Sequence, residues 1–394
     1  MALSNSSILA RWLGPLRRVH AQFWLNPPAG VVPSEQYAAV IMKPDGIGDF
    51  ILAMSAIRLV LQHHGEQNCA LLIAPAVEEL ARLEFPRALR IVIPAFPRHK
   101  RAFTEWRWVR RRLANVTCGS LVCLRHQRWD YHELMLSWIR SERKFVLDDT
   151  QAAAWTVGRS SFRYECEGRI AFTEPAAIIP ATATGRDCRE LRMHRRLLAG
   201  VLGEAPAVVD ILPRFAQLPL TAAANITLVA PLTGAQIKDM PVELLEQIVR
   251  RGELPVGKQI LLTGSPDQAM RLEVFRIALN RAGRTDVHVE TATSIINFVR
   301  RVASADLVLT ADTAAAHVAT ALDRPTVVVI GGGHYGQFGP WYQSGRQIWL
   351  TVPMDCFGCG WRCIHPEPYC LTRITPEQVF AAIRQVQTTG GAPT

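Results

Sequence analysis

The segment ADLVLTADTAAAHVATALDRPTVVVIGGG, residues 305–333, indicates the fold class of this chain. Residues 307–309 form a short apolar run typical of a buried strand, and the alanine-rich residues 313–322 favour a helix. Pro325 ends that helix, and residues 326–330 form a second apolar run. The order strand, helix, strand predicts a βαβ unit of a parallel α/β sheet.

The start of this predicted helix is suited to binding phosphate. Asp312 or Thr313 can cap its first turn, and free backbone N–H groups there lie at the positive end of the helix dipole. The small side chains of Ala314 and Ala315 allow a diphosphate to approach the backbone, and His317 could add a hydrogen-bond donor one turn further along. On the residues alone, a βαβ unit without any ligand explains the pattern equally well.

A second strand, turn and helix occupies residues 38–63 and contains the turn KPDGIGD. It is not the G-x-G-x-x-G dinucleotide fingerprint, because Ile51 stands where the third glycine is required. Such a turn, which here includes Gly48, lies at the carboxyl edge of a parallel sheet, where ligands bind. Asp49 either caps the helix or acts as a general base, and Asp45 is its nearby rival for the second role.

Both motifs resemble those of glycosyltransferase family 9, the ADP-heptose:lipopolysaccharide heptosyltransferases. DTAAAH at residues 312–317, followed by RPTVVVIGG and by FGPW at residues 338–341, is similar to the family pattern D-T-G-x-x-H…P-T…G…G-P-W, with Ala314 in place of the usual glycine. KPDGIGDF is similar to the amino-terminal K-x-x-x-x-G-D of the family. The resemblance covers most of residues 37–387. It implies an α/β protein of the GT-B fold, with two Rossmann-like domains facing a central cleft.

The resemblance also implies roles for individual residues. Asp49 would be the catalytic base, and residues 312–317 would hold the diphosphate of a nucleotide sugar. The family has a lysine shortly before the first helix of its second half, which makes Lys238 a diphosphate contact and Thr233 a weaker candidate. Asp267, in the turn after a predicted strand, would hold the ribose. Without the resemblance, Lys238 is an exposed lysine in a loop.

Alternating strands and helices predict parallel, doubly wound sheets in both halves of the chain. The proline-rich residues 205–224 mark the expected boundary between the halves. We expect four parts: an amphipathic extension at 1–30, an acceptor-binding Rossmann-like domain at 31–205, a nucleotide-sugar-binding Rossmann-like domain with the cysteine cluster at 206–374, and a helix at 375–394 that packs back on the first domain.

The charge of the chain favours an anionic partner. The 394 residues carry a formal net charge of +10, which suits nucleic acid, an acidic membrane surface or a phosphorylated glycan. No recognised nucleic-acid motif is present, so we expect no nucleic acid partner. Basic residues gather at 98–112 around Trp106 and Trp108. They form either a solvated helix face or a site for an anionic acceptor.

Several features bear on location. Residues 8–25 predict a basic amphipathic helix that lies on an anionic membrane surface or packs on its own domain or another subunit. No run of 18 apolar residues occurs, and the start lacks the apolar core of a secretory signal. Nine cysteines, an odd number, favour a reducing compartment. We therefore expect a cytoplasmic protein, peripheral at the inner membrane if the first helix binds there.

Four of the nine cysteines stand close together, at Cys356, Cys359, Cys363 and Cys370. Thiolates at such spacing can enclose Zn or Fe tetrahedrally, and four of them leave no open position for catalysis. Reduced, partly buried cysteines are the alternative. Family 9 members that modify autotransporter proteins carry a similar cysteine cluster that binds iron. We expect a structural metal and no catalytic one.

These features predict an inverting glycosyl transfer. Asp49 removes a proton from an acceptor hydroxyl, which attacks the anomeric carbon of ADP-activated heptose. The backbone at residues 313–315, Lys238 and His317 stabilise the leaving diphosphate. The expected acceptor is lipopolysaccharide core. Two other interpretations stay open: O-heptosylation of an autotransporter protein, and a non-enzymatic module that binds nucleotide or metal.

Overall fold

The structure, a computed structural model, describes Pro28, Leu254 and residues 30–94, 102–125, 130–148, 169–173, 188–218, 224–252 and 259–388. The helix predicted at residues 8–25 and the basic residues 98–101 lie outside the described residues. Two compact units are present. The first falls within Met1–Pro44, Val60–Pro75 and Arg87–Ala176, and the second within Asp45–Leu59, Ala76–Pro86 and Ala177–Thr394. The four-part division expected from the sequence stays a prediction.

The sheet of the first unit has six parallel strands in the order β3-β2-β1-β4-β5-β6. Their bounds are β1 Glu35–Lys43, β2 Cys69–Ile73, β3 Leu89–Val92, β4 Val116–Cys123, β5 Arg140–Asp148 and β6 Arg169–Thr173. The apolar runs of β1, β2 and β4 are continuous because strands of a parallel sheet are buried on both faces. Helices α4 (Ala102–Ala114) and α5 (Asp130–Trp138) pack on this sheet and contribute Leu113 and Trp138 to its core.

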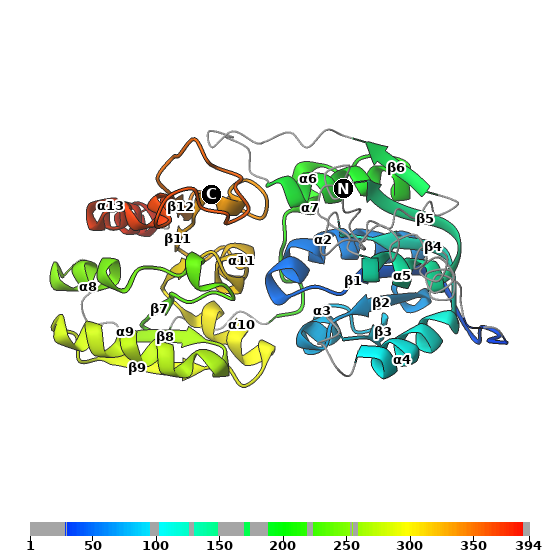
Figure 1. Cartoon of the computed structure of the whole chain (residues 1–394), viewed down its shortest axis with the longest axis horizontal. Coiled ribbons are helices and arrows are strands. Elements are labelled where there is room, and N and C mark those ends of the chain that lie inside the picture. Colours follow the sequence, from blue (N-terminus) through cyan, green and yellow to red (C-terminus); the bar gives the residue numbers. More distant parts are fainter. Residues whose placement is uncertain are drawn as a thin grey trace, which may run out of the picture. The chain divides into compact units, whose positions relative to one another are not determined.

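The sheet of the second unit repeats this plan with strands β12-β11-β10-β7-β8-β9, again all parallel (Figure 1). The bounds are β7 Ile226–Ala230, β8 Gln259–Gly264, β9 Val287–Thr291, β10 Leu307–Ala311, β11 Thr326–Val329 and β12 Gln347–Leu350. From β7 the sheet continues outward through β8 and β9, and from β10 it continues outward on the other side through β11 and β12. The strand order therefore reverses between these two strands, which is where ligands bind to such sheets.

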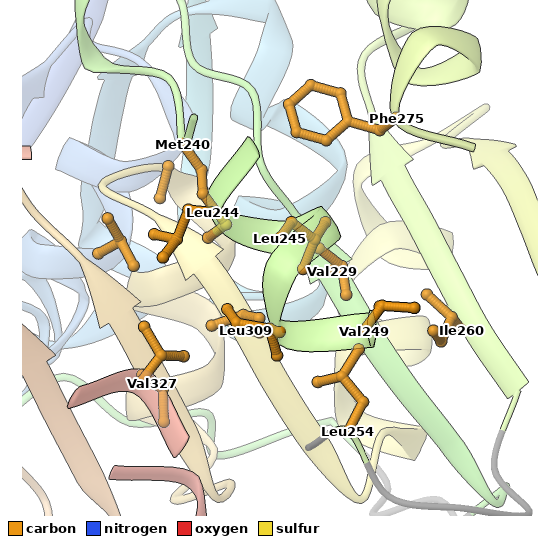
Figure 2. Close-up of a cluster of buried hydrophobic side chains, with 14 of the residues drawn as sticks. Val229, Met240, Leu244, Leu245, Val249, Leu254, Ile260, Phe275, Leu309 and Val327 are labelled. Carbon is orange, nitrogen blue, oxygen red and sulfur yellow. The ribbon is translucent and has the colours of Figure 1, made fainter. Parts of the chain in front are cut away.

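Helices cover both faces of the second sheet. One face carries α8 (Val242–Arg250), α9 (Ala269–Arg281) and α13 (Pro376–Thr388). Figure 2 shows this core, in which Leu245 and Val249 of α8 lie over Val229, Leu309 and Val327 of three neighbouring strands. On the other face, α11 (Ala314–Ala321) contacts β10 and β11 and packs beside α10 (Ile295–Ser304).

The last helix belongs to the core of the second unit, to which α13 contributes its buried side chains. Its expected packing on the first domain stays a prediction. Val379, Ile383 and Val386 form one apolar face, and α13 contacts α8, β11 and β12. The sheet of the second unit, which directly precedes α13 in the chain, buries this apolar face.

Two segments from the first half of the sequence belong to the second unit, and buried polar contacts hold them there. They include the start of α2 (Ile47–His64) and α3 (Glu78–Glu84). Ser55 Oγ donates to the Leu212 carbonyl at 2.7 Å. The fully buried Glu84 carboxylate pairs with Arg58 at 2.9 Å and accepts from the Ala216 backbone N–H at 2.8 Å.

The remaining helices are short connections, with one exception. Helix α6 (Arg189–Leu202) ends at Gly203, whose φ of 87° supplies the left-handed turn that commonly ends a helix. The others are α7 Val208–Ile211, α12 Tyr369–Thr372, and the 3₁₀ turns η1 Glu66–Asn68, η2 Pro75–Val77, η5 Gln236–Lys238, η6 Pro266–Gln268 and η7 Gly332–His334. Within the described ranges, no helix combines the length and the apolar character needed to cross a membrane.

Candidate active site

The site is built on two loops that leave the second sheet side by side. Strands β7 and β10 are parallel neighbours, with Ala230 opposite Thr310 near their carboxyl ends. The loop after β7 carries Thr233 and Lys238, and Asp312 and Thr313 follow β10 directly. The strand order reverses at this pair, so both loops open onto the position where doubly wound sheets bind their ligands.

Thr313 is the residue that caps α11. Its Oγ1 accepts a hydrogen bond from the Ala315 backbone N–H at 3.0 Å, and its carbonyl accepts one from the Ala316 N–H at 3.1 Å. Ala315 and Ala316 are buried, whereas Ala314 is half-buried. The sequence left the cap open between Asp312 and Thr313, and the structure assigns it to Thr313. The small residues keep the positive end of the helix accessible to an anion.

Lys238 lies at the centre of this region. Its Nζ is 3.3 Å from Nδ1 of His334, and it lies over the Trp361 ring, 5.1 Å from the ring centroid. An ammonium group only donates, so Nδ1 of His334 accepts. Burial raises the pKa of Asp312, and the nearby Lys238 ammonium acts in the opposite direction. A lysine at the switch point of the sheet is placed to bind a phosphate.

The loop that presents Lys238 is held by its neighbour Asp239. Asp239 Oδ1 accepts from the Thr233 backbone N–H at 2.7 Å and lies 3.1 Å from Thr233 Oγ1, which also lies 2.6 Å from the Ala235 carbonyl. Arg271 of α9 forms an ion pair with Asp239. Thr233 thus serves the loop's own hydrogen bonding. The sequence analysis missed Asp239, whose spacing from Thr233 has no distinctive pattern.

His317 is buried and has a defined proton position. Trp341, which is fully buried, donates its indole N–H to Nδ1 of His317 at 3.1 Å, and Trp349 in turn donates to the Trp341 carbonyl at 3.1 Å. Burial, with the Lys238 charge second, lowers the pKa of His317 to about 4. The ring is therefore neutral at pH 7. Because an indole N–H only donates, the imidazole proton must be on Nε2.

The first turn of α2 meets His317 inside the second unit. A Cβ on Gly48 would lie 2.9 Å from Cδ2 of His317, a separation that requires glycine. The Cα of Ala314 is 3.8 Å from the same point. Asp49 follows in the first turn of α2 and is half-buried, whereas Asp45 is only 3% exposed. Asp49 is thus the more accessible carboxylate beside the helix start that carries Ala314 and His317.

Among the described residues, Asp267 has no hydrogen bond or ion pair with Lys238, Thr313 or His317. It stands in η6, exposed, within a turn closed by a capping box between Ser265 and Gln268. A hydrogen bond from Ser265 lowers the pKa of Asp267 and keeps it ionised. Gln268 Nε2 donates to the Thr233 carbonyl at 2.9 Å, which ties this turn to the lysine loop. Its predicted role at the ribose stays a prediction.

The four clustered cysteines line one pocket together with Trp361 and His365. Cys370 is buried, and burial together with the neighbouring thiols raises its pKa. The donor atoms suit Zn or Fe. Across the described ranges, however, no group of three or more Cys, His, Asp or Glu side chains is arranged to hold a metal ion. The residues fit a metal by chemistry and by location, but a ligand shell is not preformed.

Comparison with known proteins finds one family whose model matches part of this chain. Residues 217–362 match the model of glycosyltransferase family 9 (heptosyltransferase). No curated protein sequence gives a significant match. The family match covers 146 of the 394 residues and lies in the second half of the chain.

Solved structures show the same fold. Escherichia coli heptosyltransferase WaaC with ADP is 18% identical with a TM-score of 0.60, and the match covers 88% of this chain and 99% of that one. E. coli ADP-heptose lps heptosyltransferase II is 15% identical with a TM-score of 0.59, covering 90% and 99%. TibC of enterotoxigenic E. coli, a dodecameric iron-containing heptosyltransferase, is 14% identical with a TM-score of 0.51, covering 91% and 78%. These matches confirm the expected GT-B fold.

Proposed function

We propose that this protein transfers a heptose from ADP-heptose to an acceptor hydroxyl with inversion at the anomeric carbon. The observation that carries the proposal is the contact between Gly48 and His317. It brings the first turn of α2, with Asp49, against the first turn of α11. A carboxylate for the acceptor and donor groups for a diphosphate thus lie together in one compact unit.

Asp49 is the general base in this scheme. It takes the proton of the acceptor hydroxyl as that oxygen attacks the anomeric carbon and the bond from the sugar to the diphosphate breaks. Inversion needs only one carboxylate, because the acceptor displaces the leaving group in a single step. Asp49 stands in the first turn of α2, at the amino end of the helix.

The leaving ADP gains negative charge as the bond breaks, and three kinds of donor are placed for it. They are the Lys238 ammonium, the backbone N–H of Ala314 at the start of α11, and the Nε2–H of His317. His317 is suited to this role because a neutral ring with its proton fixed on Nε2 donates without itself titrating near pH 7. Removing one such preorganised donor typically costs about 10²–10³ in rate.

Lipopolysaccharide core is the acceptor that we propose first, because of charge. The chain carries a net charge of +10, and the exposed face of α4 presents Arg107, Trp108 and Arg111. Trp108 is 52% exposed, and an aromatic side chain beside guanidinium groups suits a phosphorylated sugar. Two neighbouring arginines are already engaged or buried, since Arg112 pairs with Glu35 and Arg110 is 7% exposed.

An autotransporter protein is the second candidate acceptor, and the cysteine pocket favours it. The pocket gathers four thiols in the region where the resemblance places an iron-binding cluster. We further propose that these thiols hold a structural Fe or Zn, which when bound would cross-link the segment without entering the reaction. Metal analysis of the purified protein should give about one ion per chain, lost in Cys356→Ser but retained in Cys188→Ser. Equal metal content in both variants would contradict this assignment.

The activity is tested by incubating the protein with ADP-heptose and either heptose-deficient lipopolysaccharide core or a purified autotransporter passenger. We expect ADP release together with a mass increase of one heptose on the core. A mass increase on the passenger alone would transfer the assignment to the protein acceptor. ADP binding without transfer to either acceptor would argue for the non-enzymatic module.

A further inference from the structure

We propose that Trp361, in the cysteine segment of residues 354–370, is a positioning residue for Lys238 and thereby for the donor diphosphate. This inference rests on the proposed role of Lys238. The cysteine segment would then serve the donor site through one aromatic ring, independently of any metal that its thiols hold.

The contact involves three side chains. The Lys238 ammonium lies 5.1 Å from the centroid of the Trp361 ring, within the range of a cation–π interaction. His334 completes the set, with Nδ1 3.3 Å from the same ammonium and its ring edge-on to Trp361 at 6.1 Å and 84°. The lysine chain, which has many rotamers when free, is thereby held in one direction.

The indole ring is itself firmly placed on the glycine loop after β11. A Cβ added to Gly331 or Gly333 would overlap the Trp361 ring, so only glycine permits the ring to lie against this backbone. Two backbone hydrogen bonds join the segments, from the Gly358 N–H to the Gly332 carbonyl at 2.9 Å and from the Gly360 N–H to the Gly333 carbonyl at 3.1 Å. The position of Trp361 follows from these contacts and does not depend on Lys238.

Trp361 is held at a local cost. Its φ is 65°, in the left-handed region that few residues other than glycine adopt. Its buried indole N–H has no acceptor among the described residues, which is unfavourable. Strained residues of this kind concentrate at functional sites. What Trp361 contributes is the face of its ring, and that face is where Lys238 lies.

The test is a double-mutant cycle on ADP affinity, measured by calorimetry. Lys238→Met tests the proposed function, and Trp361→Phe and Trp361→Leu test the positioning. Trp361→Phe removes no hydrogen bond and keeps a ring, and cation–π attraction is weaker for Phe than for Trp. We expect Lys238→Met to weaken ADP binding about tenfold or more. Trp361→Leu should weaken it about 3- to 30-fold, and Trp361→Phe less.

The decisive result is the double variant. If Trp361 acts through Lys238, Trp361→Leu in the Lys238→Met background should change ADP affinity by less than about twofold. The KM for donor should rise in Trp361→Leu while the KM for acceptor stays constant. Phe380→Leu is the matched control, because Phe380 lies under Arg384 at 5.6 Å on α13 and removing it takes away a cation–π pair elsewhere in the same unit.

Each other outcome is informative. Equal losses from Trp361→Leu in both backgrounds would mean that the ring acts through the local fold, and the positioning role would be wrong. Unchanged ADP affinity in Trp361→Phe and Trp361→Leu would overturn it as well. If Lys238→Met itself binds ADP normally, the assignment of Lys238 to the diphosphate fails, which is distinguishable from failure of Trp361 alone.

Discussion

The missing side chain of Gly48 is what allows two helix starts to meet. Gly48→Ala would place a methyl group 2.9 Å from the His317 ring, and His317 cannot retreat because Trp341 holds its other edge. We expect the free energy of unfolding to fall by about 1–3 kcal/mol, as for overpacked cores, with loss of turnover. Urea unfolding measures the first effect.

Gly46→Ala is the matched control for that substitution. Its Cβ would meet only Asp49 Oδ2, at the ordinary distance of 3.7 Å, and Gly46 is exposed. Its stability should therefore stay within about 0.5 kcal/mol of the parent, as is usual for surface positions. Equal destabilisation of both variants would mean that the loop needs glycine for backbone reasons and not for the contact with His317.

A second pair of substitutions distinguishes Asp49 from Asp45 as the general base. Asp49→Asn should leave ADP affinity unchanged and lower turnover by about 10²–10⁴, the usual contribution of a general base. Asp45→Asn, at a buried position, should act mainly on stability. Calorimetry for ADP and a transfer assay give both quantities. Normal turnover in Asp49→Asn, combined with its loss in a folded Asp45→Asn protein, would exchange the two assignments.

His317 makes stability depend on pH in a defined direction. Its pKa is about 4 when folded, against 6.5 for an unperturbed histidine. Above pH 6.5 both states are neutral and this group contributes no pH dependence. As the pH falls from 6.5 to 4, only the unfolded state gains a proton, so stability falls by up to about 3 kcal/mol.

The variant His317→Asn keeps an acceptor for the Trp341 N–H and removes the titration. Its free energy of unfolding should decline less steeply than that of the parent between pH 6.5 and 4, measured by urea titration at several pH values. Parallel curves for the two proteins would show that His317 is already protonated in the folded state or titrates normally.

At the scale of the element, α11 depends on a single cap. Thr313→Val keeps the shape of the side chain but removes the oxygen that accepts from Ala315. We expect it to destabilise the second unit by about 0.5–2 kcal/mol, and Thr313→Ser to recover most of that loss. Thermal unfolding measures both. A Thr313→Val protein as stable as the parent would indicate that water or another acceptor replaces the cap.

The elements that could be predicted are those with an uninterrupted local signal. The βαβ unit from β10 to β11 and the strand and helix of β1 and α2 follow from apolar runs next to glycine or proline. Strand β5 was not predicted because RSERKFVLD begins with five polar or charged residues and its short apolar run, FVL, comes only near the end. Helix α9 was missed because apolar residues lie on both sides of it: Leu272 and Leu279 are buried, but Met270 is 85% exposed.

The site residues also divide into those predicted from the sequence and those that only the tertiary structure reveals. Thr313 follows from a local motif, because a helix cap is recognised from neighbouring residues, whereas Lys238 was assigned from the resemblance to family 9. Trp341 and Trp361 were not predicted as site residues, because each acts on a side chain far away in sequence, His317 and Lys238 respectively. Aromatic residues near a glycine loop predict burial, and only the tertiary structure gives the atom that each ring faces.

At the scale of the whole molecule, both sheets have the strand order of a doubly wound fold, but only the second unit contains the candidate site. Asp45–Leu59 supplies Gly48 and Asp49 to it, so the second unit draws on both halves of the chain. Asp49 and the groups that donate hydrogen bonds to the diphosphate are therefore expected to unfold in the same transition, and a bound ligand should stabilise them together. This makes ligand-dependent unfolding a test of the entire assignment.

We predict that ADP raises the unfolding temperature of the second unit selectively over UDP and GDP. A ligand at 100 times its dissociation constant stabilises the folded state by about 2.7 kcal/mol. If calorimetry resolves two transitions, as chains with two compact units often allow, ADP should move only the one that contains the second unit. Selective stabilisation by UDP or GDP would leave the fold assignment intact but contradict ADP-heptose as the donor. Because we expect Lys238→Met to weaken ADP binding about tenfold, the same ADP concentration should stabilise that variant by only about 1.4 kcal/mol. An ADP shift of unchanged size in Lys238→Met would place the nucleotide elsewhere on the chain.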